Sequence, residues 1–163
     1  MKVWQTPQRL RIELADESET CALSEAIAQV VRPGTVIGLV GTLGAGKTRL
    51  SRAIAESLGV DPQVIASPTF VLIHEYCGSI PVYHFDTYRL ADTAEFEGLG
   101  ALEYFEAGGL CLVEWADRVA ELLPQDAWWI HIETGEQGPE ARTIEIEAPP
   151  HILRELAGLL RTE

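Results

Sequence analysis

Three glycines, a lysine and two threonines lie close together in the stretch GTLGAGKT, residues 41–48. The spacing of Gly41, Gly46, Lys47 and Thr48 fits the pattern G-x-x-x-x-G-K-[ST], which is typical of loops that bind nucleotide phosphates. In such a loop the lysine contacts the β- and γ-phosphates, the hydroxyl ligates Mg²⁺, and consecutive backbone N–H groups surround the phosphate oxygens. The sequence therefore predicts that Lys47 and Thr48 act on a bound nucleotide and its metal ion.

The glycines of this loop have a backbone role. Glycine adopts positive φ values and lets the chain come close to a ligand, and we expect both properties of Gly41, Gly44 and Gly46. An apolar run precedes the loop and a pattern with helical spacing follows it, so the positive end of a helix dipole would face the phosphates. The sequence contains no guanine-specific element of the form Asn/Thr-Lys-x-Asp, which favours ATP.

Two acidic residues end apolar runs: Asp86 closes VYHFD and Glu114 closes LCLVE. An acid at the carboxyl end of a buried strand lies at the edge where α/β folds bind ligands. Because Mg²⁺ needs further oxygen ligands and an attacking water must be positioned, we expect both acids to serve a metal-dependent reaction of the phosphates. His84 would face the same side of its strand as Asp86, and a packed structural role is expected for it.

Other side chains give weaker indications. Thr69, in SPTF, could direct its hydroxyl toward a nucleotide, although Pro68 also fits an ordinary turn. Trp115 could stack on a base or fill the edge of a sheet. Five arginines could act on phosphates, and the sequence alone does not place them at the loop: Arg49, Arg52, Arg89, Arg118 and Arg142.

The elements that must position these residues follow from the hydrophobic pattern. Alternating or continuous apolar runs predict strands over 9–16, 35–40, 69–76, 80–86, 109–115, 126–133 and 141–148. Helical spacing predicts one helix capped by Asp16 or Ser18, a second between the loop and Gly59, and a third over 151–161. The order predicts an α/β fold, a three-layer P-loop NTPase-like sandwich with a mixed sheet. With 163 residues and no linker, we expect a single domain over 1–163.

The charge of the chain limits its partners. Twelve basic and twenty-five acidic residues give a net charge of −13, so a phosphate backbone would repel the chain. Strong direct binding to nucleic acid is therefore not expected. The acidity fits either solubility or a basic protein partner.

The cysteines and the apolar runs bear on location. Cys21, Cys77 and Cys111 are odd in number, widely spaced and set among apolar neighbours, which predicts buried, reduced thiols and a cytoplasmic protein. The N-terminal segment lacks the apolar core of a signal peptide, and no run reaches the roughly 18 apolar residues of a membrane span. Neither export nor membrane insertion is expected.

The stretches GTLGAGKT, SPTF, YHFDTYRL and CLVEW, in this order, resemble the TsaE family, formerly YjeE. The resemblance covers residues 35–115 by motif. It implies a bacterial, cytoplasmic P-loop ATPase that acts with the TsaB and TsaD proteins in tRNA threonylcarbamoyladenosine biosynthesis. TsaB and TsaD transfer the threonylcarbamoyl group to the adenosine next to the anticodon, so tRNA would be met through the complex, and ATP hydrolysis would support repeated turnover.

The resemblance also implies residue roles. By motif match the segment Gly44, Ala45, Gly46, Lys47 and Thr48 would bind the phosphates of ATP, and Gly41 and Arg49, on either side of it, are further candidates for ATP binding. Thr48 and Glu114 would hold Mg²⁺, and Asp86 would support hydrolysis together with Lys47. Thr69 would lie in a switch-like loop, Trp115 would lie near the nucleotide, and Arg142 is a weaker candidate for a nucleotide contact.

One loop position departs from the family. Thr42 stands where the family usually carries aspartate, so this chain lacks that carboxylate, while the backbone cradle is unaffected.

Two other functions share the loop. A small-molecule kinase would need an acceptor pocket and usually a basic lid, and no arginine-rich lid is visible in the sequence. A nucleotide-dependent docking scaffold would bind ATP and change shape without needing hydrolysis. Loss of tRNA modification in Glu114→Ala or Asp86→Ala, with binding retained, would separate a hydrolytic cycle from such a scaffold.

Overall fold

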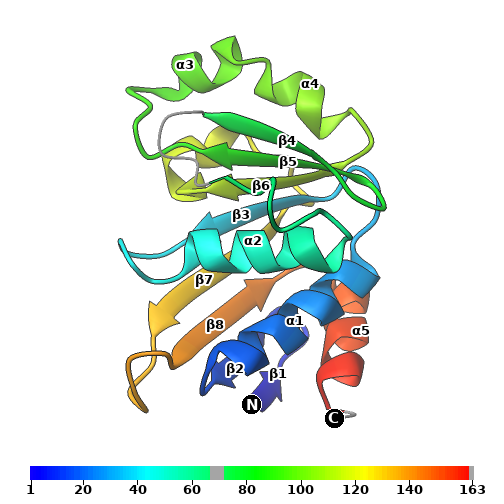
Figure 1. The fold of residues 1–163 in the computed structure, drawn as a ribbon, viewed down its shortest axis with the longest axis vertical. Helices are drawn as coiled ribbons and strands as arrows, with labels where there is room; N and C mark the ends of the chain where they lie inside the picture. The colour runs from blue at the N-terminus through cyan, green and yellow to red at the C-terminus, as the bar shows by residue number, and fades with distance from the viewer. Residues whose placement is uncertain (67–71, 162–163) are drawn as a thin grey trace.

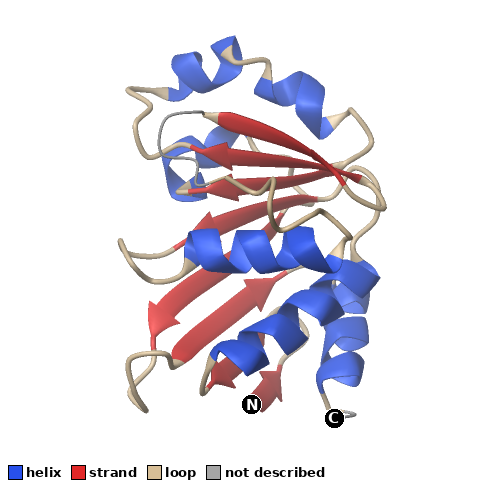
Figure 2. Ribbon diagram, in the orientation of Figure 1, coloured by secondary structure: helices blue, strands red, loops and turns tan. Residues whose placement is uncertain are grey.

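The structure is a computed structural model that describes residues 1–66 and 72–161. Eight strands form one sheet in the order β1-β2-β8-β7-β3-β6-β5-β4 (Figures 1 and 2). The strands are β1 (Lys2–Gln5), β2 (Leu10–Leu14), β3 (Val36–Val40), β4 (Ile73–Cys77), β5 (Pro81–Asp86), β6 (Leu110–Glu114), β7 (Trp128–Thr134) and β8 (Arg142–Glu147). Strands β7, β3, β6 and β5 run parallel and the remaining pairs are antiparallel, so the sheet is mixed, as predicted.

Helices cover both faces of the sheet. On one face lie α1 (Glu17–Val30), α2 (Lys47–Ser57) and α5 (Pro150–Leu160), which stand in front of the sheet in Figure 1. On the other face a second apolar cluster packs under α3 (Thr93–Gly98), α4 (Ala101–Phe105) and the 3₁₀ helix η1 (Ala116–Leu122). The three layers confirm the predicted α/β sandwich.

The local sequence explains the elements that frame the site. Asp16 caps α1, where its Oδ1 accepts a hydrogen bond from the backbone N–H of Glu19 at 3.1 Å. Strand β3 is almost wholly buried because it lies in the middle of the sheet between two parallel neighbours. The loop between β3 and α2 is thus held between two well-packed elements.

Four elements were not predicted from the sequence: β1, α3, α4 and η1. They span four to seven residues each, which is too short for a clear hydrophobic period. None of the helices in the described ranges is long and apolar enough to cross a bilayer.

The cysteine prediction was partly wrong. All three thiols are free, but only Cys111 is buried. Cys21 lies on the exposed side of α1 and Cys77 ends the edge strand β4, so apolar neighbours in sequence did not mean burial.

The register of the parallel strands brings the predicted acids together. Glu114, the last residue of β6, is level with Leu39 of β3 on one side and with Asp86 of β5 on the other. The loop that follows β3 therefore begins beside both acids, at the carboxyl edge of the sheet.

Candidate nucleotide-binding site

The loop from Gly41 to Gly46 has the backbone that its glycines allow. Gly44 and Gly46 have φ values of +81° and +114°, as predicted. Gly41 does not have a positive φ; instead, a Cβ there would lie 2.5 Å from the carbonyl oxygen of Ile132 on β7. The positive φ predicted for Gly41 was therefore wrong; the close contact found here is with the backbone of Ile132, and approach of Gly41 to a ligand stays a prediction.

Lys47 lies under the loop and is only 4% exposed. Its Nζ donates to the carbonyl oxygens of Gly41 at 2.6 Å and Thr42 at 2.9 Å, and it lies 3.7 Å from the centre of the Trp115 ring. The ammonium group thus has two carbonyl acceptors and a cation–π contact. Burial lowers the pKa of Lys47, while Glu114 and other nearby acids act in the opposite direction.

Glu114 is a buried carboxylate, 1% exposed, with a partner on each oxygen. The hydroxyl of Thr48 donates to Oε2 at 2.8 Å, and Nε2 of His84 lies 2.7 Å from Oε1. Two oxygens in neighbouring positions of an octahedral Mg²⁺ site lie about 3 Å apart, because each is about 2.1 Å from the ion. The spacing of Thr48 Oγ1 and Glu114 Oε2 thus fits Mg²⁺.

A cavity of about 250 Å³ opens at this edge of the sheet. Its walls include Lys47, Thr48, Asp86, Glu114 and Trp115, five residues that the sequence analysis selected. Among the described residues no group of three or more His, Cys, Asp or Glu could hold a metal. A magnesium ion here would depend on Thr48, Glu114 and oxygens supplied by a nucleotide and water.

Asp86 shapes the chain that follows it. Its Oδ1 accepts a hydrogen bond from the N–H of Tyr88 at 2.9 Å, and the hydroxyl of Thr87 lies 2.9 Å from the carbonyl oxygens of both Glu114 and Trp115. Tyr88 packs on Trp115 with ring centres 4.8 Å apart. Thr87 and Tyr88, the two residues that follow β5, therefore hold the end of β6.

Trp115 has a positive φ of 58°, which is unusual for a large side chain. Its backbone is held by Thr87, and its ring lies between Lys47 and Tyr88. The sequence analysis left open whether Trp115 stacks on a base or fills a sheet edge; in this structure its ring contacts the loop lysine. Thr87 and Tyr88 were missed, and their one signal was their position directly after Asp86.

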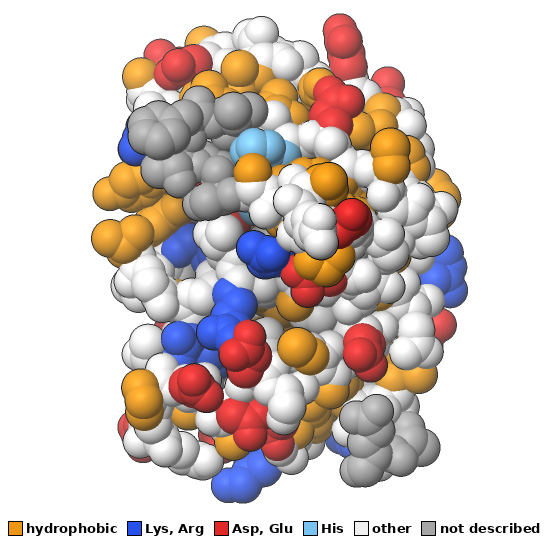
Figure 3. Space-filling model, in the orientation of Figure 1, with side chains coloured by type: hydrophobic (Ala, Val, Ile, Leu, Met, Phe, Trp, Pro, Cys, Tyr) orange, Lys and Arg blue, Asp and Glu red, His pale blue; other side chains and the backbone are white. Residues whose placement is uncertain are grey.

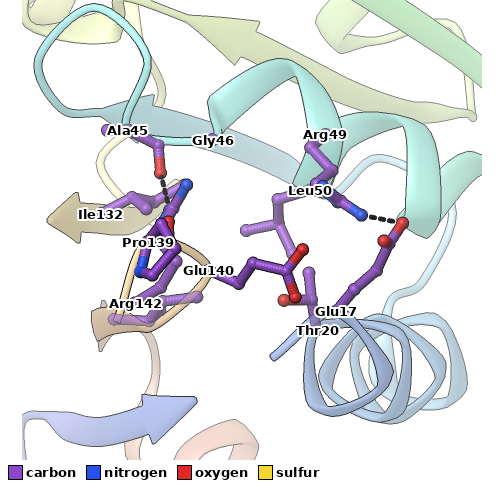
Figure 4. Close-up of a pocket in the computed structure, with 11 residues that line it drawn as sticks. Glu17, Thr20, Ala45, Gly46, Arg49, Leu50, Ile132, Pro139, Glu140 and Arg142 are labelled. Carbon is purple, nitrogen blue, oxygen red and sulfur yellow. Dashed lines mark hydrogen bonds and ion pairs between the residues drawn. The ribbon is translucent and has the colours of Figure 1, made fainter. Parts of the chain in front are cut away.

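A second cavity, of about 160 Å³, lies beside the loop between α1, α2 and the β7–β8 connection (Figure 4). Nε of Arg142 donates to the carbonyl oxygen of Ala45 at 2.6 Å, which ties the β7–β8 connection to the loop. Arg49 on α2 forms an ion pair with Glu17 on α1. Glu140 extends from the β7–β8 connection toward α1.

Arg52 and Arg118 do not line either of these two cavities. Arg52 pairs with Glu56 on the exposed side of α2, and Arg118 donates to the carbonyl oxygen of Tyr88. Thr69 lies outside the described residues. On the face shown in Figure 3 acidic side chains lie next to basic ones, so the cations there do not form one continuous surface.

A parallel strand, a glycine-rich loop, a helix that begins at Lys47 and an acid at the end of the neighbouring strand define the fold of a P-loop NTPase. The chain belongs to the TsaE family: the family model described as threonylcarbamoyl adenosine biosynthesis protein TsaE matches residues 14–144. The resemblance seen in the sequence is thereby confirmed.

Individual relatives agree with this assignment. The chain is 42% identical over 142 residues to the tRNA threonylcarbamoyladenosine biosynthesis protein TsaE of Bacillus subtilis (strain 168), covering 86% of this chain and 87% of that protein. It is 38% identical over 119 residues to the Haemophilus influenzae protein of the same name, covering 72% of each. The crystal structure of Bacillus subtilis YdiB superposes with a TM-score of 0.74 at 35% identity, over 99% of this chain and 97% of that one.

Proposed function

We propose that this protein is a Mg²⁺-dependent ATPase that supports the threonylcarbamoyladenosine modification of tRNA. The relatives carry that pathway in their names, and the family match spans most of the chain. The observation that carries the proposal is the contact of Thr48 with Glu114, because it joins the phosphate loop to an acid at a spacing that suits a magnesium ion.

Each residue of the site then has a role in binding or hydrolysing ATP. Loop N–H groups and the start of α2 bind the phosphates, and Lys47 exchanges part of its present contacts for the β- and γ-phosphates. Thr48 and Glu114 hold Mg²⁺, which when bound neutralises charge on the phosphate oxygens. Asp86 orients the attacking water, whose oxygen bonds to the γ-phosphorus while the bond to the β–γ bridging oxygen breaks. ADP leaves with the bridging oxygen, and the proton of the water passes to solvent.

The adenosine occupies the second cavity. That cavity adjoins the loop through Ala45 and Gly46 and continues along α2 to Arg49 and Leu50. Arg142 and Arg49 lie at its border, where their cations are near the phosphate side of a bound nucleotide. Both residues are thus proposed nucleotide contacts.

The chain acts through a complex in the cytoplasm. We propose TsaB and TsaD as its partners, with tRNA held by them, because a net charge of −13 opposes direct contact with a phosphate backbone. Hydrolysis on this chain then supports repeated turnover of the transfer that TsaB and TsaD perform.

Phosphate release tests the proposal. Release from Mg·ATP is measured for the protein alone and then with TsaB, TsaD and tRNA, with Lys47→Ala as the blank. A rise with the partners that depends on Lys47 is expected. A flat rate despite ATP binding would contradict the hydrolytic cycle, and ATP consumption that appears only with a small acceptor, without free phosphate, would identify a kinase.

A further inference from the structure

Both carboxylate oxygens of Glu114 have a contact, and the proposed metal site explains only the contact of Oε2. Thr48 contacts Oε2 from the start of α2, and His84 contacts Oε1 from β5. We infer that His84 is a positioning residue: it fixes the rotation of the Glu114 carboxylate so that Oε2 faces Thr48, where the two residues would hold Mg²⁺. This inference rests on the proposed function of the site.

His84 sits on a rigid support. It is level with Leu112 of β6 on one side and with His74 of β4 on the other, so its strand is paired along both edges. The side chain is 3% exposed. A donor placed on such a strand keeps its direction without help from a ligand.

The contact has a defined direction. A carboxylate that binds Mg²⁺ has only acceptor oxygens, so in that role Oε1 of Glu114 accepts from Nε2 of His84, which lies 2.7 Å away. Glu114 is buried, and an oxygen left without a donor there would favour rotation toward another partner.

The two contacts differ in what a metal would do to them. Thr48 and Glu114 would hold Mg²⁺ through the oxygens that now contact each other, whereas Oε1 is the other oxygen of the carboxylate and contacts His84. The His84 contact can therefore persist with and without the ion. Partners of metal ligands typically change metal affinity by about 10- to 100-fold when they are removed.

Two substitutions of similar shape separate positioning from packing. His84→Gln keeps an N–H donor at about the reach of Nε2, and His84→Met fills a similar volume without a donor. Binding of ADP to the full chain is measured by calorimetry in Mg²⁺ and in EDTA. The quantity compared is the Mg²⁺ factor, which is the dissociation constant of ADP in EDTA divided by that in Mg²⁺.

For His84→Met we expect this Mg²⁺ factor to fall about tenfold or more, while ADP affinity in EDTA changes less than about twofold. His84→Gln should keep most of the factor. If Mg²⁺ tightens ADP binding to His84→Met as much as to the unmodified protein, the inference is overturned. It is also overturned if both variants lose ADP affinity equally in EDTA, because such a loss would show that His84 acts through packing. If the unmodified protein shows no Mg²⁺ dependence at all, the proposed function fails first and the inference with it.

Discussion

The hydroxyl of Thr48 lies 2.8 Å from Oε2 of Glu114, although 66 positions separate the two residues in sequence. The parallel pairing of β3 with β6 produces this contact, because it sets the end of β6 beside the loop that leads into α2. The strand pairing of the sheet therefore places the glycine-rich loop and the acid Glu114 in direct contact.

Thr48→Ala should weaken Mg²⁺-dependent nucleotide binding by roughly tenfold or more, because it removes an oxygen ligand and the donor to Glu114. Thr48→Ser keeps the hydroxyl and is the matched control, which should bind within a few-fold of the unmodified protein. Titration of ADP in Mg²⁺ and in EDTA measures both. If Mg²⁺ tightens ADP binding to Thr48→Ala as much as to the unmodified protein, Thr48 is not a ligand of the metal ion.

Gly41→Ala should lower the free energy of unfolding by about 1–3 kcal/mol, since its Cβ would lie 2.5 Å from the carbonyl oxygen of Ile132. Gly158, in α5, is the opposite case: it has no heavy atom within 4 Å of an added Cβ and no positive φ. Gly158→Ala should raise stability by about 0.5–1 kcal/mol. Urea unfolding compares the two, and a neutral Gly41→Ala would refute the tight packing of loop against β7.

Arg142→Ala should reduce stability by roughly 1–3 kcal/mol, because the guanidinium holds the carbonyl oxygens of Ala45, Pro139 and Ala141. Nucleotide affinity should fall as well, since the loop loses its tie to the β7–β8 connection. Arg154→Ala, an exposed change on α5, provides the control. Thermal melting and ADP titration together test this, and identical behaviour of the two variants would show that Arg142 does not support the loop.

Burial raises the pKa of Cys111 to about 12, from an ordinary value of 9.0. Between these values the unfolded chain loses this proton first, so the contribution of Cys111 to stability is complete below pH 9 and declines as pH rises toward 12. The decline should approach about 1.4 kcal/mol per pH unit. Urea unfolding of the protein and of Cys111→Ala across this range should differ by that slope, and parallel curves would disprove the assignment.

Much of this architecture could be predicted because its signals are local. The phosphate loop, the cap at Asp16 and the alternating strands each depend on neighbours within a few residues. The position of Asp86 beside Glu114 could be predicted because the carboxyl ends of parallel strands lie at the same edge of a sheet.

The rest depended on register and long-range contact. His84 reaches Glu114 because β5 and β6 pair in one particular alignment, which no pattern within either strand specifies. Gly41 is restricted by a carbonyl of β7, far along the chain, so its true neighbour was not visible in the loop itself. The positive φ of Trp115 likewise reflects the hydrogen bond from Thr87, on another segment.

The most direct test of the central claim uses the two lysines of the sequence, Lys2 and Lys47. Binding of a non-hydrolysable ATP analogue in Mg²⁺ is measured by calorimetry for Lys47→Ala and for Lys2→Ala, which makes the same charge change at an exposed position. Our account predicts one nucleotide per chain, unchanged affinity in Lys2→Ala and a roughly 10- to 100-fold loss in Lys47→Ala. Equal affinity in both variants would contradict the claim that the loop at residues 41–48 binds the phosphates of ATP.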